Sequence, residues 1–179
     1  MSTLWTVGHS TRSAEELLAL LAEHEIAALV DVRRFPASRR HPQFSRAELA
    51  AALAAAGVAY THEVDLGGRR APRPDSPNVA WRVEAFRGYA DWMDGAPFAA
   101  ALARLLAQAE LRRTVILCAE AVPWRCHRRL ISDAAVARGF TVRHILAPGR
   151  SEEHALDPNA HPRADGRLVY SGPSPGLPF

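Results

Sequence analysis

Lysine is absent from this chain: all 22 residues of the lysine and arginine class are arginine. A composition rich in arginine and alanine follows from GC-rich codon use, and we explain the overall arginine content in that way. Local clusters of arginine are different, because the guanidinium group binds phosphate and carboxylate through two parallel hydrogen bonds. The formal net charge of +3 is too small to indicate a nucleic-acid partner by itself.

Other absences exclude whole classes of protein. No apolar run approaches the ~20 residues that a membrane helix needs, so we expect no membrane partner. The N-terminus lacks a basic segment followed by an apolar one, so we expect no secretory signal. The 2 cysteines are too few for a disulfide framework. With 179 residues and 48% hydrophobic content, the chain is expected to be a cytoplasmic globular protein.

Short apolar runs alternate with segments of helical periodicity through residues 1–146. Strands are predicted at Leu4–Val7, Ile26–Val32, Val58–His62, Val115–Leu117 and Thr141–Leu146. Helices are predicted at 13–24, 45–57, 81–93, 98–106 and 130–138. The first two open on the capping-box pairs Ser13/Glu16 and Ser45/Glu48. This alternation predicts a single α/β domain of Rossmann-like, three-layer form, with a mostly parallel sheet of about five strands flanked by helices on both faces.

The expected strand order brings several polar loops together. We predict the order 3-2-1-4-5, which places the first and fourth strands side by side with the topological switch point between them. The loops that follow the first, second and fourth strands would then meet at one edge of the sheet.

Residues 147–179 are rich in proline, glycine and charge. They are predicted to form a C-terminal extension, a surface tail with a short ordered piece at Arg167–Tyr170. We expect the last residues, from Ser171 to Phe179, to be mobile.

The segment from Cys118 to Arg129 concentrates the chemistry of the chain, because it holds both cysteines on a predicted strand-to-helix loop. Cys126 is predicted in the first turn of the helix, where the helix dipole and free N–H groups favour a thiolate. His127 and the adjacent arginines, among them Arg128, add positive potential. This pattern is typical of a reactive cysteine, and the alternative is a structural cysteine at a helix start.

Cys118 is predicted at the carboxyl end of the central strand. Cysteine phosphatases and rhodaneses place their nucleophile in a similar setting, but with five residues before the arginine. Here six residues separate Cys118 from Arg125, and the loop carries Glu120 and no glycine. A phosphate cradle tolerates bulk and negative charge poorly, so we interpret Cys118 as a buried small residue. A redox pair with Cys126 is the alternative.

Three polar residues near predicted strand ends have both a catalytic and a structural interpretation. His9 suits acid–base chemistry at neutral pH, or it hydrogen-bonds the backbone at the switch point. Asp31 interrupts an apolar strand and needs a partner, either His9 or an arginine of the central loop. Glu120 is a catalytic carboxylate or the structural partner of Arg33 or Arg128. For both acids we favour structural pairing.

A metal site is a further alternative for the polar residues of these loops. Its ligands would come from Cys118, Cys126, His127, His9 and Glu120. Recognised structural zinc sites use tighter paired spacing, so we assign no metal ligand. The sequence identifies no cofactor.

The loop from Arg33 to His41 is a candidate surface for a polyanion, together with Arg69, Arg70 and Arg73. The aromatic residues that follow are Trp81, Phe86, Tyr89 and Trp92. Exposed aromatic rings can stack on bases, but rings at helical spacing more often belong to a core.

Motifs spread along the chain resemble those of one known family. They are Thr6-Val-Gly-His9-Ser10-Thr, Asp31-Val-Arg-Arg34, Pro42-Gln-Phe-Ser45, Leu66-Gly-Gly68, Phe86-Arg-Gly-Tyr89, and Cys118-Ala-Glu120 with Cys126-His127-Arg128. This combination resembles the domain of unknown function 488 (DUF488) family from about Thr6 to Ile145. The resemblance implies an α/β fold of Rossmann-like character and supplies no established reaction.

Two functions from different classes fit the sequence. The first is an enzyme, a thiol-dependent hydrolase or transferase, acting on a small anionic or phosphorylated substrate. Its catalytic residues would be Cys126, His127, His9 and Glu120. Its substrate-binding residues would be Ser10, Asp31, Arg33, Arg34 and Arg128. The second is a nucleic-acid-associated protein in which the arginines contact phosphates and the Cys-His loop is structural or metal-binding. The pattern favours the first, because no nucleic-acid-binding motif is present. The sequence does not determine the oligomeric state.

Overall fold

The computed structural model describes residues 1–172. The strands are β1 (Thr3–Gly8), β2 (Ala28–Asp31), β3 (Ala59–His62), β4 (Thr114–Cys118), β5 (Thr141–Ala147), β6 (Arg150–Glu153), β7 (Ala160–Pro162) and β8 (Leu168–Tyr170). The helices are α1 (Ala14–Glu23), α2 (Arg46–Ala55), α3 (Glu84–Trp92), α4 (Ala96–Leu111) and α5 (Arg128–Val136). Short 3-10 helices lie at η1 (Pro42–Phe44), η2 (Val64–Leu66) and η3 (Pro123–Arg125).

The main sheet has six strands in the order β3-β2-β4-β1-β5-β6. The pairs from β3 to β5 are parallel, and β6 returns antiparallel to β5. The predicted order 3-2-1-4-5 is therefore wrong in one respect, because β4 lies between β2 and β1. Every residue of β4 is buried, as this interior position requires. The predicted adjacency of the first and fourth strands is correct, with Gly8 opposite Cys118.

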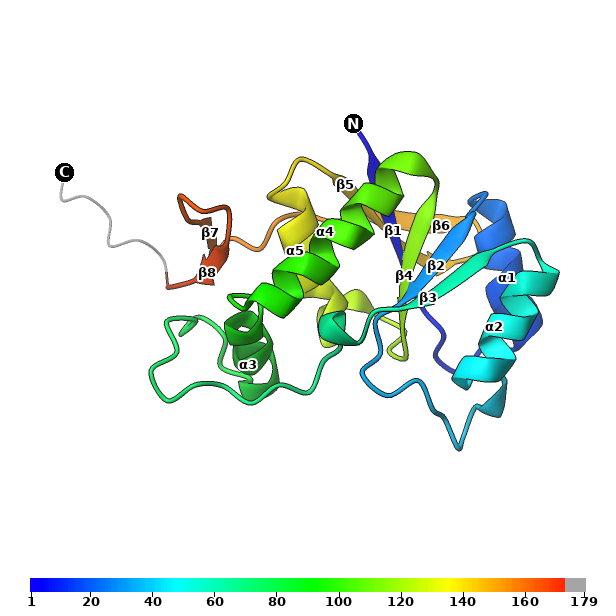
Figure 1. Ribbon diagram of the computed structural model, residues 1–179, viewed down its shortest axis with the longest axis horizontal. Helices are drawn as coiled ribbons and strands as arrows, with labels where there is room; N and C mark the ends of the chain where they lie inside the picture. Colours follow the sequence, from blue (N-terminus) through cyan, green and yellow to red (C-terminus); the bar gives the residue numbers. More distant parts are fainter. Residues whose placement is uncertain (173–179) are drawn as a thin grey trace.

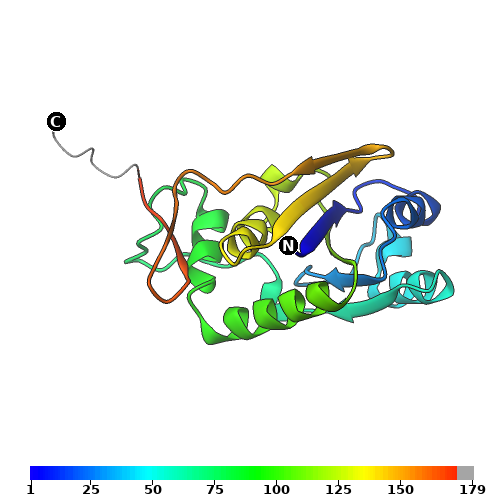
Figure 2. The ribbon, with the colours of Figure 1, turned by 90° about the horizontal axis from the view of Figure 1, so that it is seen from above.

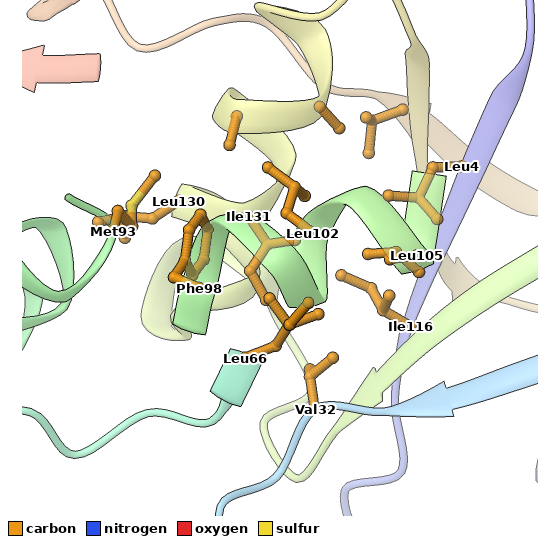
Figure 3. Packing of buried hydrophobic residues seen from close by; sticks show 14 of the residues in the cluster. Leu4, Val32, Leu66, Met93, Phe98, Leu102, Leu105, Ile116, Leu130 and Ile131 are labelled. Carbon is orange, nitrogen blue, oxygen red and sulfur yellow. The ribbon is translucent and has the colours of Figure 1, made fainter. Parts of the chain in front are cut away.

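Helices cover both faces of the sheet, as Figures 1 and 2 show. α1 and α2 pack on one face, where Leu17, Leu21 and Leu49 join one hydrophobic cluster. α4 and α5 pack on the other face in a second cluster (Figure 3), which includes Leu102 and Ile131. The structure is thus the three-layer, Rossmann-like α/β fold that the alternation predicted.

The helix starts predicted from capping residues and periodicity agree only partly with the structure. Ser13 caps α1 and accepts a hydrogen bond from the N–H of Glu16 at 3.1 Å, as predicted. Ser45 is the N-cap of α2, but its side chain makes no capping bond, and its Oγ lies 3.5 Å from the N–H of Ser38. α3 begins at Glu84, later than the predicted helix. None of the described helices has the length and apolar character needed to cross a membrane.

The C-terminal segment is tied to the body of the protein more closely than a surface tail. β6 extends the main sheet, and β7 pairs with β8 in a hairpin beside α3. Leu168 and Tyr170 are buried in the cluster of α4 and α5. The ordered piece predicted at Arg167–Tyr170 is present as β8, but Leu168 and Tyr170 are buried and do not belong to a surface tail. The mobility expected for Ser171 to Phe179 falls mostly on residues 173–179, which lie outside the described part of the chain.

Candidate functional site

The loops that follow β1, β2 and β4 meet at one edge of the sheet, as the sequence predicted. The N–H of His9 donates to the carbonyl oxygen of Cys118 at 3.0 Å, which joins the first and fourth loops. Gly8 permits this approach, because a Cβ at that position would lie 1.7 Å from the carbonyl oxygen of Glu120. Since β4 separates β2 from β1, its loop contacts both of the others.

A cavity of about 760 Å³ opens where these loops meet. Its cationic and imidazole lining consists of Arg33, Arg34, Arg39, Arg40, Arg69, Arg125, His9, His41 and His127. Glu120 is the one acidic residue among the described residues of this lining, which also includes Cys118 and Cys126. A concave wall with so strong an excess of one charge attracts anions.

Cys126 lies just outside helix α5 rather than in its first turn. The helix begins at Arg128 with His127 as its N-cap, because the preceding loop forms η3. The sulfur of Cys126 nevertheless accepts a hydrogen bond from the main-chain N–H of Arg128 at 3.4 Å, and it lies 3.6 Å from Nδ1 of His127. Burial raises the pKa of the Cys126 thiol. The hydrogen bond from Cys118 and the charges of His127 and Arg128 outweigh burial and hold the pKa well below its ordinary value.

The tautomer of His127 is fixed by the main chain. Its Nε2 lies 2.9 Å from the carbonyl oxygen of Val32, which can only accept a hydrogen bond. Nε2 therefore carries a proton, and Nδ1 faces the sulfur of Cys126. Gly68 leaves room for this ring, since a Cβ there would lie 3.0 Å from Nδ1. The arrangement pairs a thiol with an oriented base.

Arg128 lies beneath the thiols and does not line the cavity. It is 1% exposed, and its guanidinium donates to Oγ1 of Thr6 at 3.1 Å and to the carbonyl oxygen of Glu120 at 2.7 Å. Its Nε finds no hydrogen-bond partner within residues 1–172. Burial lowers the pKa of Arg128, but the facing sulfur atoms of Cys118 and Cys126 raise it by more. Arg128 is thus a buried cation that stabilises negative charge on sulfur.

A chain of hydrogen bonds links Arg128, the first residue of α5, to Asp133 in the same helix. Oγ1 of Thr6 contacts Nδ1 of His144 at 2.7 Å, and Nε2 of His144 contacts Nδ1 of His154 at 3.0 Å. Nε2 of His154 reaches Oδ1 of Asp133 at 2.8 Å. One set of protons satisfies every contact: the hydroxyl donates to His144, His144 donates to His154, and His154 donates to the carboxylate. Burial holds the pKa of His144 at about 3, so this ring is neutral as the chain requires.

Asp31 orients Arg33, which lines the cavity. The fully buried carboxylate of Asp31 accepts from Nε of Arg33 at 2.9 Å, from Nη2 at 2.7 Å, and from the hydroxyl of Tyr60 at 2.7 Å. The partner expected for Asp31 was His9 or an arginine of the central loop, and the structure shows Arg33 from its own loop. Asp31 does not reach the cavity, so it acts through Arg33.

His9 is held as a neutral ring behind Arg33. Its Nδ1 donates to the carbonyl oxygen of Ser10 at 2.9 Å, and its Nε2 lies 3.5 Å from Nη1 of Arg33. The ring stacks on Phe44 with centroids 4.4 Å apart. Burial is the main cause that lowers the pKa of His9 to about 4. Of the two interpretations that the sequence offered for His9, the structure shows the hydrogen bond to the backbone, and the acid–base role stays a prediction.

The remaining predicted residues lie at the rim. Ser10 lines the cavity at a positive φ of 48°. Arg34 donates to the carbonyl oxygen of Arg69 at 2.7 Å. The side chain of Glu120 is exposed, and within the described residues it forms no ion pair with Arg33 or Arg128; Arg128 uses its main-chain oxygen instead.

Part of the predicted basic and aromatic surface turns away from the cavity. Arg70 stacks on Trp92 at 3.8 Å, and the N–H of Arg73 donates to Asp91 at 2.8 Å. These two arginines pack against the α3 region, whereas Arg69 and the basic side chains of the loop 33–41 line the cavity. Phe86 and the fully buried Tyr89 also line it.

Sequence reasoning missed the chain behind Arg128. Its members, Thr6, His144, His154 and Asp133, received no functional assignment. Thr6 interrupts the apolar run Leu4–Val7, and that interruption is the signal that could have found it. His144 gives no such signal, because Arg143 beside it in β5 is also polar. The metal alternative gains no support, because no group of three or more histidine, cysteine or acidic residues within residues 1–172 is arranged to hold a metal ion.

The fold and cavity define an α/β protein of Rossmann-like architecture with an arginine-lined pocket over a buried pair of thiols at its switch point. Residues 13–135 match the family described as "Domain of unknown function DUF488". The chain therefore belongs to the DUF488 family, as the motifs indicated. No curated protein and no solved structure matches it significantly.

Proposed function

We propose that this protein is a thiol-dependent enzyme, a hydrolase or transferase that acts on a small anionic substrate bound in the arginine-lined cavity. One observation carries the proposal: the Cys126 sulfur, at a cavity wall rich in arginine, accepts an N–H hydrogen bond at 3.4 Å and faces an oriented imidazole nitrogen at 3.6 Å. A nucleophile, its base and an anion-binding wall thus share one cavity.

His127, Arg128 and Cys126 have separate roles in the proposed reaction. Nδ1 of His127 accepts the proton of the Cys126 thiol, because its Nε2 proton is held by the carbonyl oxygen of Val32. The buried Arg128 cation stabilises the thiolate from behind. The thiolate attacks the electrophilic atom of the substrate, and the protonated His127 returns its proton to the leaving group.

The anionic part of the substrate binds the arginines of the wall. Arg33 is held rigid by Asp31 and offers Nη1 beside the neutral His9, whereas Arg34 and the exposed Arg39 and Arg40 line the approach. We assign Ser10 to substrate contact. The exposed carboxylate of Glu120 is the group we assign to activating water in a hydrolytic half-reaction.

Alkylation with iodoacetamide, followed by mass spectrometry of each cysteine peptide, tests this proposal. We expect Cys126 to react well below the pH at which an ordinary thiol ionises, and inorganic pyrophosphate to slow the reaction. The matched control is Arg112→Ala, which changes an exposed arginine outside the cavity and should leave protection intact, whereas Arg34→Ala should weaken it.

Two results would overturn the proposal. One is a Cys126 alkylation rate that rises only around the pKa of an ordinary thiol. The other is pyrophosphate protection that is absent while a single-stranded oligonucleotide binds with strong salt dependence. That second outcome would support the nucleic-acid alternative.

A further inference from the structure

Cys118 is a second thiol that the proposed reaction does not use. It ends β4, is 2% exposed, and packs into the hydrophobic cluster of α4 and α5. Its sulfur lies 3.9 Å from the carbonyl oxygen of Glu120, which accepts a hydrogen bond from the guanidinium of Arg128. The main-chain N–H of the same Arg128 donates to the sulfur of Cys126. Both sulfur-bearing residues line the same cavity, and both are free thiols.

The surroundings of the two thiols are unequal. Burial raises the pKa of Cys118 well above its ordinary value, and its hydrogen bond to Cys126 adds to this. Cys126 is the sulfur that receives the N–H of Arg128 and the imidazole of His127. A thiolate reacts with peroxides, whereas a protonated thiol does not. Oxidation therefore begins at Cys126, with Cys118 in place as the second partner.

We propose that Cys126 and Cys118 form a reversible disulfide when hydrogen peroxide enters the cavity, with Cys126 as the oxidised residue and Cys118 as the resolving residue. The inference shares Cys126 with the proposed function and rests on it only for the consequence that the disulfide removes the nucleophile. The oxidant is a hydroperoxide small enough for the cavity.

The first step makes a sulfenic acid. The Cys126 thiolate attacks one peroxide oxygen, a sulfur–oxygen bond forms, and the oxygen–oxygen bond breaks. The departing hydroxide takes a proton, for which Nδ1 of a protonated His127 lies beside the sulfur. The products are Cys126 sulfenic acid and water, and sulfur has lost two electrons to the peroxide.

The second step closes the disulfide. The sulfur of Cys118 attacks the sulfur of Cys126, a sulfur–sulfur bond forms, and the sulfur–oxygen bond breaks. The leaving hydroxide combines with the Cys118 proton to form a second water. Over both steps, two thiols and one peroxide give one disulfide and two waters. A dithiol reductant reverses the change by thiol–disulfide exchange.

Mass spectrometry of the wild-type protein after peroxide treatment tests the inference without any mutation. We expect the intact mass to fall by two hydrogen atoms, a cross-linked peptide joining the two cysteines, and full reversal by dithiothreitol. An intact mass that instead rises by whole oxygen atoms at Cys126, with no cross-linked peptide, would overturn the inference.

A pair of variants gives a second readout. In Cys118→Ser, the sulfenic acid should persist, and dimedone should label Cys126 at least roughly tenfold more than in the wild type, as expected when the resolving thiol is lost. In Cys126→Ser, peroxide should leave Cys118 unmodified. Equal dimedone labelling of wild type and Cys118→Ser would contradict the resolving role. Circular dichroism confirms that each variant is folded.

These outcomes are separable from those of the proposed function. Pyrophosphate protection of reduced Cys126 does not depend on disulfide formation. Loss of the disulfide with intact protection would refute only the redox inference, and loss of protection with an intact disulfide would refute only the anionic substrate.

Discussion

Nδ1 of His127 lies 3.6 Å from the sulfur of Cys126, and the opposite ring nitrogen is held by a main-chain carbonyl. The positive charge of His127 is one of the causes that lower the pKa of Cys126. We therefore predict that His127→Ala slows iodoacetamide alkylation of Cys126 roughly tenfold near neutral pH, which corresponds to one pKa unit. Free imidazole added to the variant should restore part of the rate.

His161→Ala is the matched control for this experiment. His161 lies in β7 and is not among the residues that line the cavity. In this variant, iodoacetamide should alkylate Cys126 at the same rate as in the wild type. Equal slowing in both variants would show that the effect of His127 is general rather than local.

The ion pair between Asp31 and Arg33 is buried, and we predict that Asp31→Asn destabilises the protein strongly. Asp31 is fully buried, and Arg33 is 7% exposed. Removing one partner leaves an uncompensated charge, which costs about 3 kcal/mol or more of the free energy of unfolding. Urea denaturation measures this loss. Pyrophosphate protection of Cys126 should also weaken, because Arg33 loses its fixed orientation.

Glu63→Gln removes an exposed ion pair, and its loss of stability is compared with that of Asp31→Asn. Glu63 pairs with the exposed Arg104 at 2.9 Å with similar two-point geometry. Solvent screens this pair, so its loss should cost at most about 1 kcal/mol. A similar cost for both variants would contradict the special role of the buried pair.

Two buried histidines predict acid sensitivity. Burial lowers the pKa of His9 to about 4 and that of His144 to about 3, from 6.5 in the unfolded chain. Between these values the unfolded chain binds more protons than the folded protein. The free energy of unfolding should therefore decrease as the pH falls below about 6.5, by at most about 1.4 kcal/mol per pH unit for each histidine. Urea denaturation at a series of pH values measures this slope.

His144→Gln removes one of these titrating groups. The variant should be less stable at neutral pH, because the buried hydrogen-bond chain is disturbed, but its stability should depend less on pH. An unchanged slope would show that other groups cause the acid sensitivity.

Gly68 leaves space for the His127 ring, and we predict that Gly68→Ala lowers the reactivity of Cys126. A Cβ at Gly68 would lie 3.0 Å from Nδ1, so the ring must shift by a few tenths of an ångström. Alkylation of Cys126 should slow, with a small change in the thermal midpoint. Gly172→Ala, where a Cβ would meet nothing within 4 Å, should change neither.

Much of the fold could be predicted, because it depends on local patterns. The alternation of apolar runs and helical periodicity was enough to predict the three layers. The strand ends were enough to predict that the loops after β1, β2 and β4 meet at one edge of the sheet. Strand order is different: β2 and β4 are both fully buried, and nothing in either sequence shows which strand lies beside β1.

The groups behind the thiols could not be predicted for a related reason. Thr6 and His144 face each other because β1 and β5 pair in that register, although 138 positions separate them. Asp133 is satisfied by His154 and Tyr170, both from the extension expected to lie on the surface. These contacts depend on tertiary register, which residue spacing along the chain does not specify.

The hydrogen-bond chain from Arg128 to Asp133 makes the C-terminal extension part of the electrostatic environment of Cys126. His154 and Tyr170 do not line the cavity. Both hydrogen-bond to the carboxylate of Asp133, which is the last group of the hydrogen-bond chain that begins at Arg128. Sequence drift in this segment would therefore tune the acidity of the thiol from a distance.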